Sequence, residues 1–248
     1  FGRPALAAVV LVQALGLILS TIRDGTPVGT WLFLDHLWPE LATKRLEWAG
    51  TVAATGGSLL VAFARRPVAR FLGAAVASAW CLALALAEWN NGGAAFTHLA
   101  VPAHATRIAA PLILALWEAR GAAAGILRLS IASTFLVHGI EALGLHAGFV
   151  DYLLAADRNI FGLGLTQGGA EITLRLIGVH DVALALLVLA GLRDRRVLGW
   201  MAIWGAITAL SRVVQMGGHG LHHTVVRVAN GGLPLALLLL HHEVSMTR

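Results

Sequence analysis

Runs of about 20 apolar residues recur along the whole chain, and this feature constrains the fold more than any other. A helix needs about this many residues to cross a bilayer, and in lipid the backbone must satisfy its own hydrogen bonds, as a helix does. We therefore expect an all-α integral membrane protein with eight transmembrane helices. The expected spans cover residues 4–22, 43–64, 67–89, 99–118, 123–143, 171–192, 196–215 and 223–242.

Composition supports a membrane protein and argues against a nucleic-acid partner. Hydrophobic residues make up 58% of the chain, and charged residues make up 12%. A formal charge of +5 would suggest nucleic acid as the partner of a soluble domain. Here many arginines lie in short links between apolar runs, where they set the orientation of a membrane protein. The expected partner is the lipid bilayer, and no nucleic acid is expected.

The arginine-rich links predict which way the chain crosses the membrane. They are residues 64–70, 118–128 and 193–196, and all three join expected spans on one side. The positive-inside rule places such links in the cytoplasm. We therefore expect both termini to be cytoplasmic, and Pro111 and Pro234 to kink the fourth and eighth spans.

The two halves of the chain show weak internal similarity. Arg45-Leu46 opens the second span as Arg175-Leu176 opens the sixth, and HATRIA at 104–109 corresponds to HTVVRVA at 223–229. Similar offsets predict a tandem duplication of a four-helix unit. Because each unit has an even number of helices, the repeats would be parallel, with a first unit at 1–121 and a second at 122–248. The repeat also makes the first run a transmembrane helix rather than a signal peptide.

The expected topology brings ionisable side chains of the second unit to the outer side of the membrane. His138 and Glu141 are three residues apart near the end of the fifth span, and His180-Asp181 lies in the outer half of the sixth. Ionisable groups within a span cost about 2.5–3.5 kcal/mol each, so they usually mark a site, a relay or a pathway. The candidate metal ligands are His138, His146, His180, His219, His222 and His223.

Several ligands fit this set of side chains. Imidazole and carboxylate suit iron, copper or zinc, and two imidazoles such as those of His138 and His180 can ligate a haem b. A histidine beside an acid can instead exchange a proton with a quinone or quinol, which makes Glu141 and Asp181 the candidate catalytic groups. Arg227 could bind a cofactor propionate or an anionic substrate, or extend to lipid headgroups. The motif HGLHH is also compatible with a polar interfacial loop.

The first unit has different residues at the corresponding positions. Gln13, Gly50 and Thr51 stand where the second unit has His138, His180 and Asp181. The first unit is therefore expected to be a scaffold. A smaller site built from Glu47, His98, His104 and Arg107 is the alternative.

The segment RLSIASTFLVHGIEAL at 128–143 resembles the first helix of the DoxX-like family. The sequence departs from the family pattern at Ala142, where lysine is common, and the similar order of helices extends over 123–242. The resemblance implies a prokaryotic cytoplasmic-membrane protein that is a partner in a redox complex; one member, DoxD, is associated with thiosulfate oxidation that passes electrons to quinone. The matching residues are Arg128, Leu129, Phe135, Leu136, His138, Gly139 and Leu143.

Three functions are compatible with these observations. The first is a subunit of a respiratory or sulfur-type redox complex that binds a quinone, metal or haem near the outer face and passes electrons, as a quinone-linked oxidoreductase subunit would. The second is a non-catalytic architectural or assembly subunit of a larger membrane complex. The third is a small-solute transporter, which parallel repeats would suit. The outer loops at 23–42 and 144–170 are compatible with lids or with flexible connectors.

Overall fold

The computed structural model describes residues 2–91, 95–191 and 194–246, and throughout these ranges the regular elements are helices. By length and composition, six of the described helices can cross a membrane. This confirms the prediction of a helical, membrane-type protein. The six are α1 (Gly2–Arg23), α3 (Glu40–Phe63), α4 (Pro67–Asn90), α7 (Arg120–Leu143), α9 (Gln167–Leu189) and α10 (Arg195–Met216).

The fourth and eighth expected spans are interrupted helices. The fourth consists of α5 (Ala100–Ala103) and α6 (Ala105–Ala115), which meet at His104. The eighth consists of α11 (Leu221–Val225) and α12 (Ala229–Met246), with a turn at 226–228 between them.

Both interrupted helices contain a proline inside their longer segment, away from the interruption. Pro111 lies inside α6 and Pro234 lies inside α12. A proline has no backbone N–H, so the carbonyl four residues earlier loses its helical partner. In α6 that carbonyl belongs to Arg107, and Nε2 of Gln13 donates a hydrogen bond to it at 3.0 Å. A side chain of α1 thus satisfies a backbone group that lipid could not.

Short helices form the connections. After α1 come α2 (Pro27–Thr30) and the π-helix η1 (Trp31–Asp35), and after α7 come α8 (Ala147–Ala156) and the π-helix η3 (Asp157–Phe161). Two 3₁₀ helices, η2 (Thr97–Leu99) and η4 (Gly217–Gly220), precede α5 and α11.

Two buried carboxylates hold these connections in place. In the first, Glu47 of α3 accepts hydrogen bonds from the backbone N–H and the hydroxyl of Thr26. In the second, Asp157 accepts hydrogen bonds from the N–H groups of Leu163 and Leu165 at 2.8 and 2.7 Å. The loops at 23–42 and 144–170 are therefore ordered by internal hydrogen bonds.

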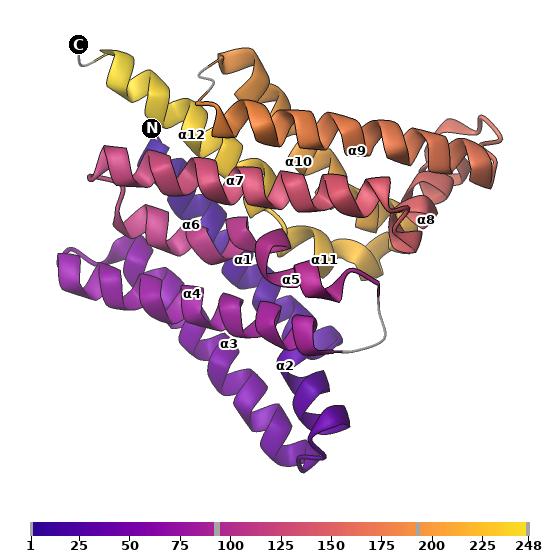
Figure 1. Ribbon diagram of the computed structural model, residues 1–248. Coiled ribbons are helices and arrows are strands. Elements are labelled where there is room, and N and C mark those ends of the chain that lie inside the picture. The colour runs from indigo at the N-terminus through magenta and orange to yellow at the C-terminus, as the bar shows by residue number, and fades with distance from the viewer. Residues whose placement is uncertain (1, 92–94, 192–193, 247–248) are drawn as a thin grey trace.

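One apolar core joins both halves of the chain. In Figure 1, α3 and α4 pack together on one side, α9 and α10 lie on the other, and α1, α6, α7 and α12 lie between them. Fully buried side chains from both halves belong to one cluster, including Leu6, Ile113, Leu127, Ile131, Leu233 and Leu237. The expected units at 1–121 and 122–248 therefore share their interior.

Large apolar side chains are exposed along the outer helices, as lipid contact requires. The start of α1 meets the end of α12, where the N–H of Gly2 donates to Oε1 of Glu243 at 2.8 Å. Arg3, Arg65 and Arg70 lie around a hollow at this end of the molecule. The exposed apolar side chains include Val52, Leu59, Phe71, Val76, Ile172, Val179, Ile203 and Ile207.

Candidate functional site

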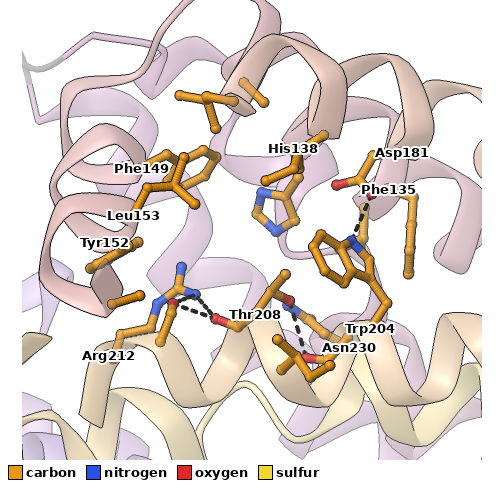
Figure 2. Close-up of a pocket in the computed structure, with 18 of the residues that line it drawn as sticks. Phe135, His138, Phe149, Tyr152, Leu153, Asp181, Trp204, Thr208, Arg212 and Asn230 are labelled. Carbon is orange, nitrogen blue, oxygen red and sulfur yellow. Dashed lines mark hydrogen bonds between the residues drawn. The ribbon is translucent and has the colours of Figure 1, made fainter. Parts of the chain in front are cut away.

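A cavity of 330 Å³ lies in the second half of the chain, between α7, α8, α9, α10 and α12 (Figure 2). Most of its wall is apolar or aromatic, and a few polar groups point into it. Concave, mostly apolar cavities with a few placed polar groups are the usual form of a small-molecule site. The lining residues used below are Thr134, His138, Phe149, Tyr152, Ala156, Phe161, Asp181, Trp204, Ile207, Arg212 and Asn230.

His138 and Glu141 form a pair on α7 at the cavity. Nδ1 of His138 lies 2.9 Å from Oε2 of Glu141, as expected for residues three apart on one helical face. The Glu141 side chain is buried, and the imidazole of His138 points into the cavity. Glu141 thereby fixes the ring orientation and leaves the Nε2 edge of His138 for a ligand.

Close packing of α7 on α9 places His138 near Asp181. A Cβ on Gly139 would lie 2.9 Å from the carbonyl oxygen of Gly178, and one on Gly178 would lie equally close to that of Gly139. Small residues at such positions let helix backbones approach. Larger side chains here would push His138 and Asp181 apart.

Asp181 is part of a chain of hydrogen bonds between α9 and α10. Its Oδ1 accepts from Nε1 of Trp204 at 2.8 Å and lies 2.9 Å from Nδ1 of His180. Nε2 of His180 accepts from Nε1 of Trp200 at 2.7 Å. Both ring nitrogens of His180 are therefore engaged, and its side chain lies outside the cavity lining.

Arg212 is a cation at the cavity that the sequence analysis missed. The residue is only 8% exposed, its guanidinium lies 4.7 Å from the centre of the Tyr152 ring, and it donates to the carbonyl of Thr208 and the hydroxyl of Ser211. Its Nε atom is buried without a hydrogen-bond partner. Among the described residues, no carboxylate forms an ion pair with Arg212.

A signal for Arg212 was present in the sequence. It is an ionisable residue within the expected span at 196–215, and such residues usually face protein or a site. Tyr152 and Trp204 carried no comparable signal, because aromatic side chains are common in membrane helices.

The helix α8 covers the cavity. Phe149, Tyr152, Leu153 and Ala156 line it from α8, and Phe161 lines it from η3. The loop at 144–170 thus packs over the site, which the sequence left open.

His146 and His219 lie away from the cavity. Nδ1 of His146 accepts a hydrogen bond from the N–H of Gly148 at 3.1 Å and caps the start of α8. Its ring stacks on Phe149, with centroids 4.8 Å apart, and on Phe96. His219 is exposed in η4.

His222 and His223 form a separate cluster with Asp24, a residue the sequence analysis did not select. Their Nε2 atoms lie 2.5 and 3.3 Å from Oδ2 of Asp24. Arg227, expected at a cofactor, donates a hydrogen bond to the backbone carbonyl of His223 at 2.9 Å. Of the histidines predicted as metal ligands, His138 lines the cavity, whereas His222 and His223 form a cluster at the end of α1.

The alternative site in the first half is not assembled by these contacts. Glu47 binds Thr26, whereas Nε2 of His104 lies 3.4 Å from Glu88. His98 is exposed in η2.

The cavity group can bind a ligand that has an apolar body and polar atoms. His138 can exchange a proton, Asp181 can hold one, and Arg212 can stabilise negative charge in a site poor in water. No protein-family model, curated protein or solved structure matches this chain.

Proposed function

We propose that this protein binds a quinone in the cavity beneath α8 and serves as a membrane subunit of a redox complex. The observation that carries the proposal is Arg212, a buried cation that has no carboxylate partner among the described residues and lies at a largely apolar cavity that His138 also faces. A buried charge needs compensation, and a ligand oxygen that becomes negative on reduction supplies it.

The polar groups suit the head of a quinone. His138 presents an imidazole edge to one carbonyl oxygen, while Arg212 is available to the other. Phe149, Tyr152 and Trp204 supply aromatic walls for the ring. In this arrangement the quinone ring lies between α8 and α10.

The cavity also has an apolar edge through which a membrane-soluble ligand can enter. Phe161 and Ile207 line the cavity and are 65% and 47% exposed. Ile207 lies in the middle of α10, at a depth where acyl chains surround a membrane helix. We therefore place the isoprenoid tail of the quinone at this edge.

Protons that accompany quinone reduction need carriers, and the site has two candidates. Glu141 is hydrogen-bonded to His138, so this pair can transfer a proton to the ligand. Asp181 lines the cavity and is oriented by Trp204. His180 would act by positioning Asp181, because its own ring nitrogens are engaged.

This geometry favours a quinone over a haem. A haem held by His138 and His180 needs the two imidazole nitrogens to face each other across open space. His138 faces the cavity, whereas Nε2 of His180 accepts a hydrogen bond from Trp200.

The rest of the proposal follows the expected duplication and the DoxX-like resemblance. Each half contains a long helix, a short helix with a π-helix, two long helices and an interrupted helix, and this order supports two related units at 1–121 and 122–248. With the arginine-rich end in the cytoplasm of a prokaryote, the cavity lies toward the outer face.

A transporter is the second candidate. Interrupted helices at corresponding positions of two repeats are typical of transporters, and α5–α6 and α11–α12 fit this pattern. A transporter would catalyse solute uptake in sealed vesicles, whereas a quinone subunit would bind quinone and transport nothing.

The proposed function can be tested with the purified full chain in nanodiscs. Ubiquinone and menaquinone analogues with short tails are titrated, and binding is followed by calorimetry. We expect one site per chain, lost in the double variant His138→Gln/Arg212→Gln and retained in His219→Gln. Equal binding by the double variant and the control would reject the proposal.

A further inference from the structure

We infer that Asp24, His222 and His223 form a binding site for a divalent transition-metal ion such as Zn²⁺. One oxygen or nitrogen atom from each side chain lies within 4.8 Å of the other two. The residues come from the end of α1 and from α11, so chain segments 198 residues apart supply the site.

The donor atoms suit such an ion. Two imidazole nitrogens and one carboxylate oxygen are typical ligands of zinc and its neighbours, whereas calcium and magnesium prefer oxygen atoms alone. Ligands about 2.1 Å from a tetrahedral zinc ion lie about 3.4 Å apart. The distance from His223 Nε2 to Asp24 Oδ2, 3.3 Å, is close to this value, and the 2.5 Å distance from His222 requires a small side-chain shift.

Two imidazoles converge on one carboxylate oxygen, and this arrangement favours a bound cation. Without a cation, each ring must carry a proton on Nε2 to face Oδ2 of Asp24. Neutral imidazoles can do so, but two N–H donors then compete for one oxygen atom, and the ring centroids are only 4.0 Å apart. A single bound cation replaces both protons and is attracted by the carboxylate.

The surroundings combine a fixed ligand with an open one. His222 is 3% exposed, whereas the Asp24 side chain is 51% exposed. Protein surrounds His222, whose Nδ1 atom is buried without a hydrogen-bond partner, and exposed Asp24 leaves room for a water molecule as a fourth ligand. The bond from Arg227 to the His223 carbonyl fixes the backbone beside the site.

This metal site is separate from the quinone cavity and would have a structural role. Asp24, His222 and His223 are absent from the cavity lining. Asp24 follows α1 in the first half of the chain, and the histidines lie in the second half. Metal binding therefore fastens the two halves at the end opposite to the Gly2–Glu243 contact.

Metal binding to purified protein tests the inference. The full chain, without a polyhistidine tag, is treated with EDTA and then titrated with Zn²⁺ against a competing chelator, with Mg²⁺ as a parallel probe. Because buried His222 contributes to packing, the test variants are Asp24→Asn and His223→Gln. The matched control is His219→Gln, which removes an exposed histidine three residues from His222.

We expect one Zn²⁺ per chain in the wild type and in His219→Gln, and binding at least about tenfold weaker in Asp24→Asn and His223→Gln. At equal concentration, Zn²⁺ should raise the melting temperature of the wild type more than that of the two test variants. Co²⁺ should give the visible absorption of a site with nitrogen and oxygen ligands. Absent binding, or binding that Asp24→Asn and His223→Gln do not weaken, would overturn the inference.

Discussion

The proposed duplication aligns the region of Gly50 and Thr51 in the first half with that of His180 and Asp181 in the second, and the two regions pack differently. In the second half, α8, α9 and α10 surround a cavity with His138 and Asp181 at its wall. In the first half, Trp80 packs against Gly50, where an added Cβ would lie 2.3 Å from the indole ring. Thr51 there forms a hydrogen bond with Thr21 at 2.9 Å. Trp80 covers Gly50 in the first half, whereas a cavity lies beside Asp181 in the second.

This difference shows what a binding site requires beyond polar residues. Gln13, which the proposed duplication aligns with His138, is also buried and polar, but its Nε2 atom donates to the Arg107 carbonyl. Buried polar atoms without a hydrogen-bond partner occur in both halves, among them Oε1 of Gln13 and Nε of Arg212. Arg212 differs from Gln13 because it lines the cavity.

The largest expected effect on stability comes from removing the Trp80 side chain in the first half. Trp80→Ala removes the indole from Gly50 and should lower the free energy of unfolding by about 3 kcal/mol. Quinone binding by the folded fraction should remain unchanged. Denaturation in detergent, monitored by circular dichroism, gives the change in the free energy of unfolding. A loss below about 0.5 kcal/mol would show that packing of Trp80 on Gly50 contributes little to stability.

Filling the cavity of the second half should weaken quinone binding. Ala156→Trp places an indole in the cavity beneath α8 and should weaken quinone binding about 100-fold, or about 2.7 kcal/mol. Stability should change little, because the side chain enters existing space. Ala147→Trp is the control, since Ala147 is exposed on the same helix. Equal quinone affinity in the two variants would show that quinone does not bind in the cavity.

Replacing Arg212 should change quinone affinity and thermal stability in different ways. Arg212→Met removes a buried charge without a carboxylate partner, so the melting temperature should stay level or rise. Loss of a charged hydrogen bond should weaken quinone binding by about tenfold or more. Calorimetry and thermal unfolding measure the two effects. Lower stability with unchanged affinity would make Arg212 a structural residue.

Making the second half resemble the first should have a smaller effect. His138→Gln introduces glutamine, the residue that the proposed duplication aligns with His138 in the first half (Gln13). The change removes an imidazole that forms a hydrogen bond to the quinone and exchanges a proton with it. We expect quinone affinity to fall about threefold to tenfold. The converse change, Gln13→His, should leave affinity unchanged. Equal changes in quinone affinity for His138→Gln and Gln13→His would show that the two halves do not differ in quinone binding.

The smallest change in affinity is expected for Asp181→Asn. The amide oxygen can still accept from Trp204, so the dissociation constant should change less than about threefold. An amide cannot take up or release a proton as a carboxyl group can, so proton uptake on quinone reduction should fall. A pH-indicator measurement during chemical reduction of bound quinone checks this, and unchanged uptake would exclude Asp181 as a carrier.

Local pattern predicted much of the fold and part of the site. The expected span at 67–89 agrees with α4, Pro67–Asn90, because apolar length and a proline at the start are local signals. The three-residue spacing of His138 and Glu141 likewise predicted their contact.

Contacts between distant segments could not be predicted in this way. Asp24 meets His222 across 198 residues, and no spacing rule connects them. The cavity depends on how α8 folds over α10, which packing decides. The eighth expected span was a continuous apolar run, yet the chain turns at 226–228, against Gly16 of α1.

Photoaffinity labelling tests the central claim most directly. A quinone that carries an azide on its ring is bound to the protein in nanodiscs and irradiated, and the labelled peptides are identified by mass spectrometry. The account predicts labels within 149–161 of α8 and η3 and within 204–212 of α10, suppressed by excess unlabelled quinone. Labels confined to the lipid-facing surfaces of α3 and α4, or insensitive to competition, would contradict it.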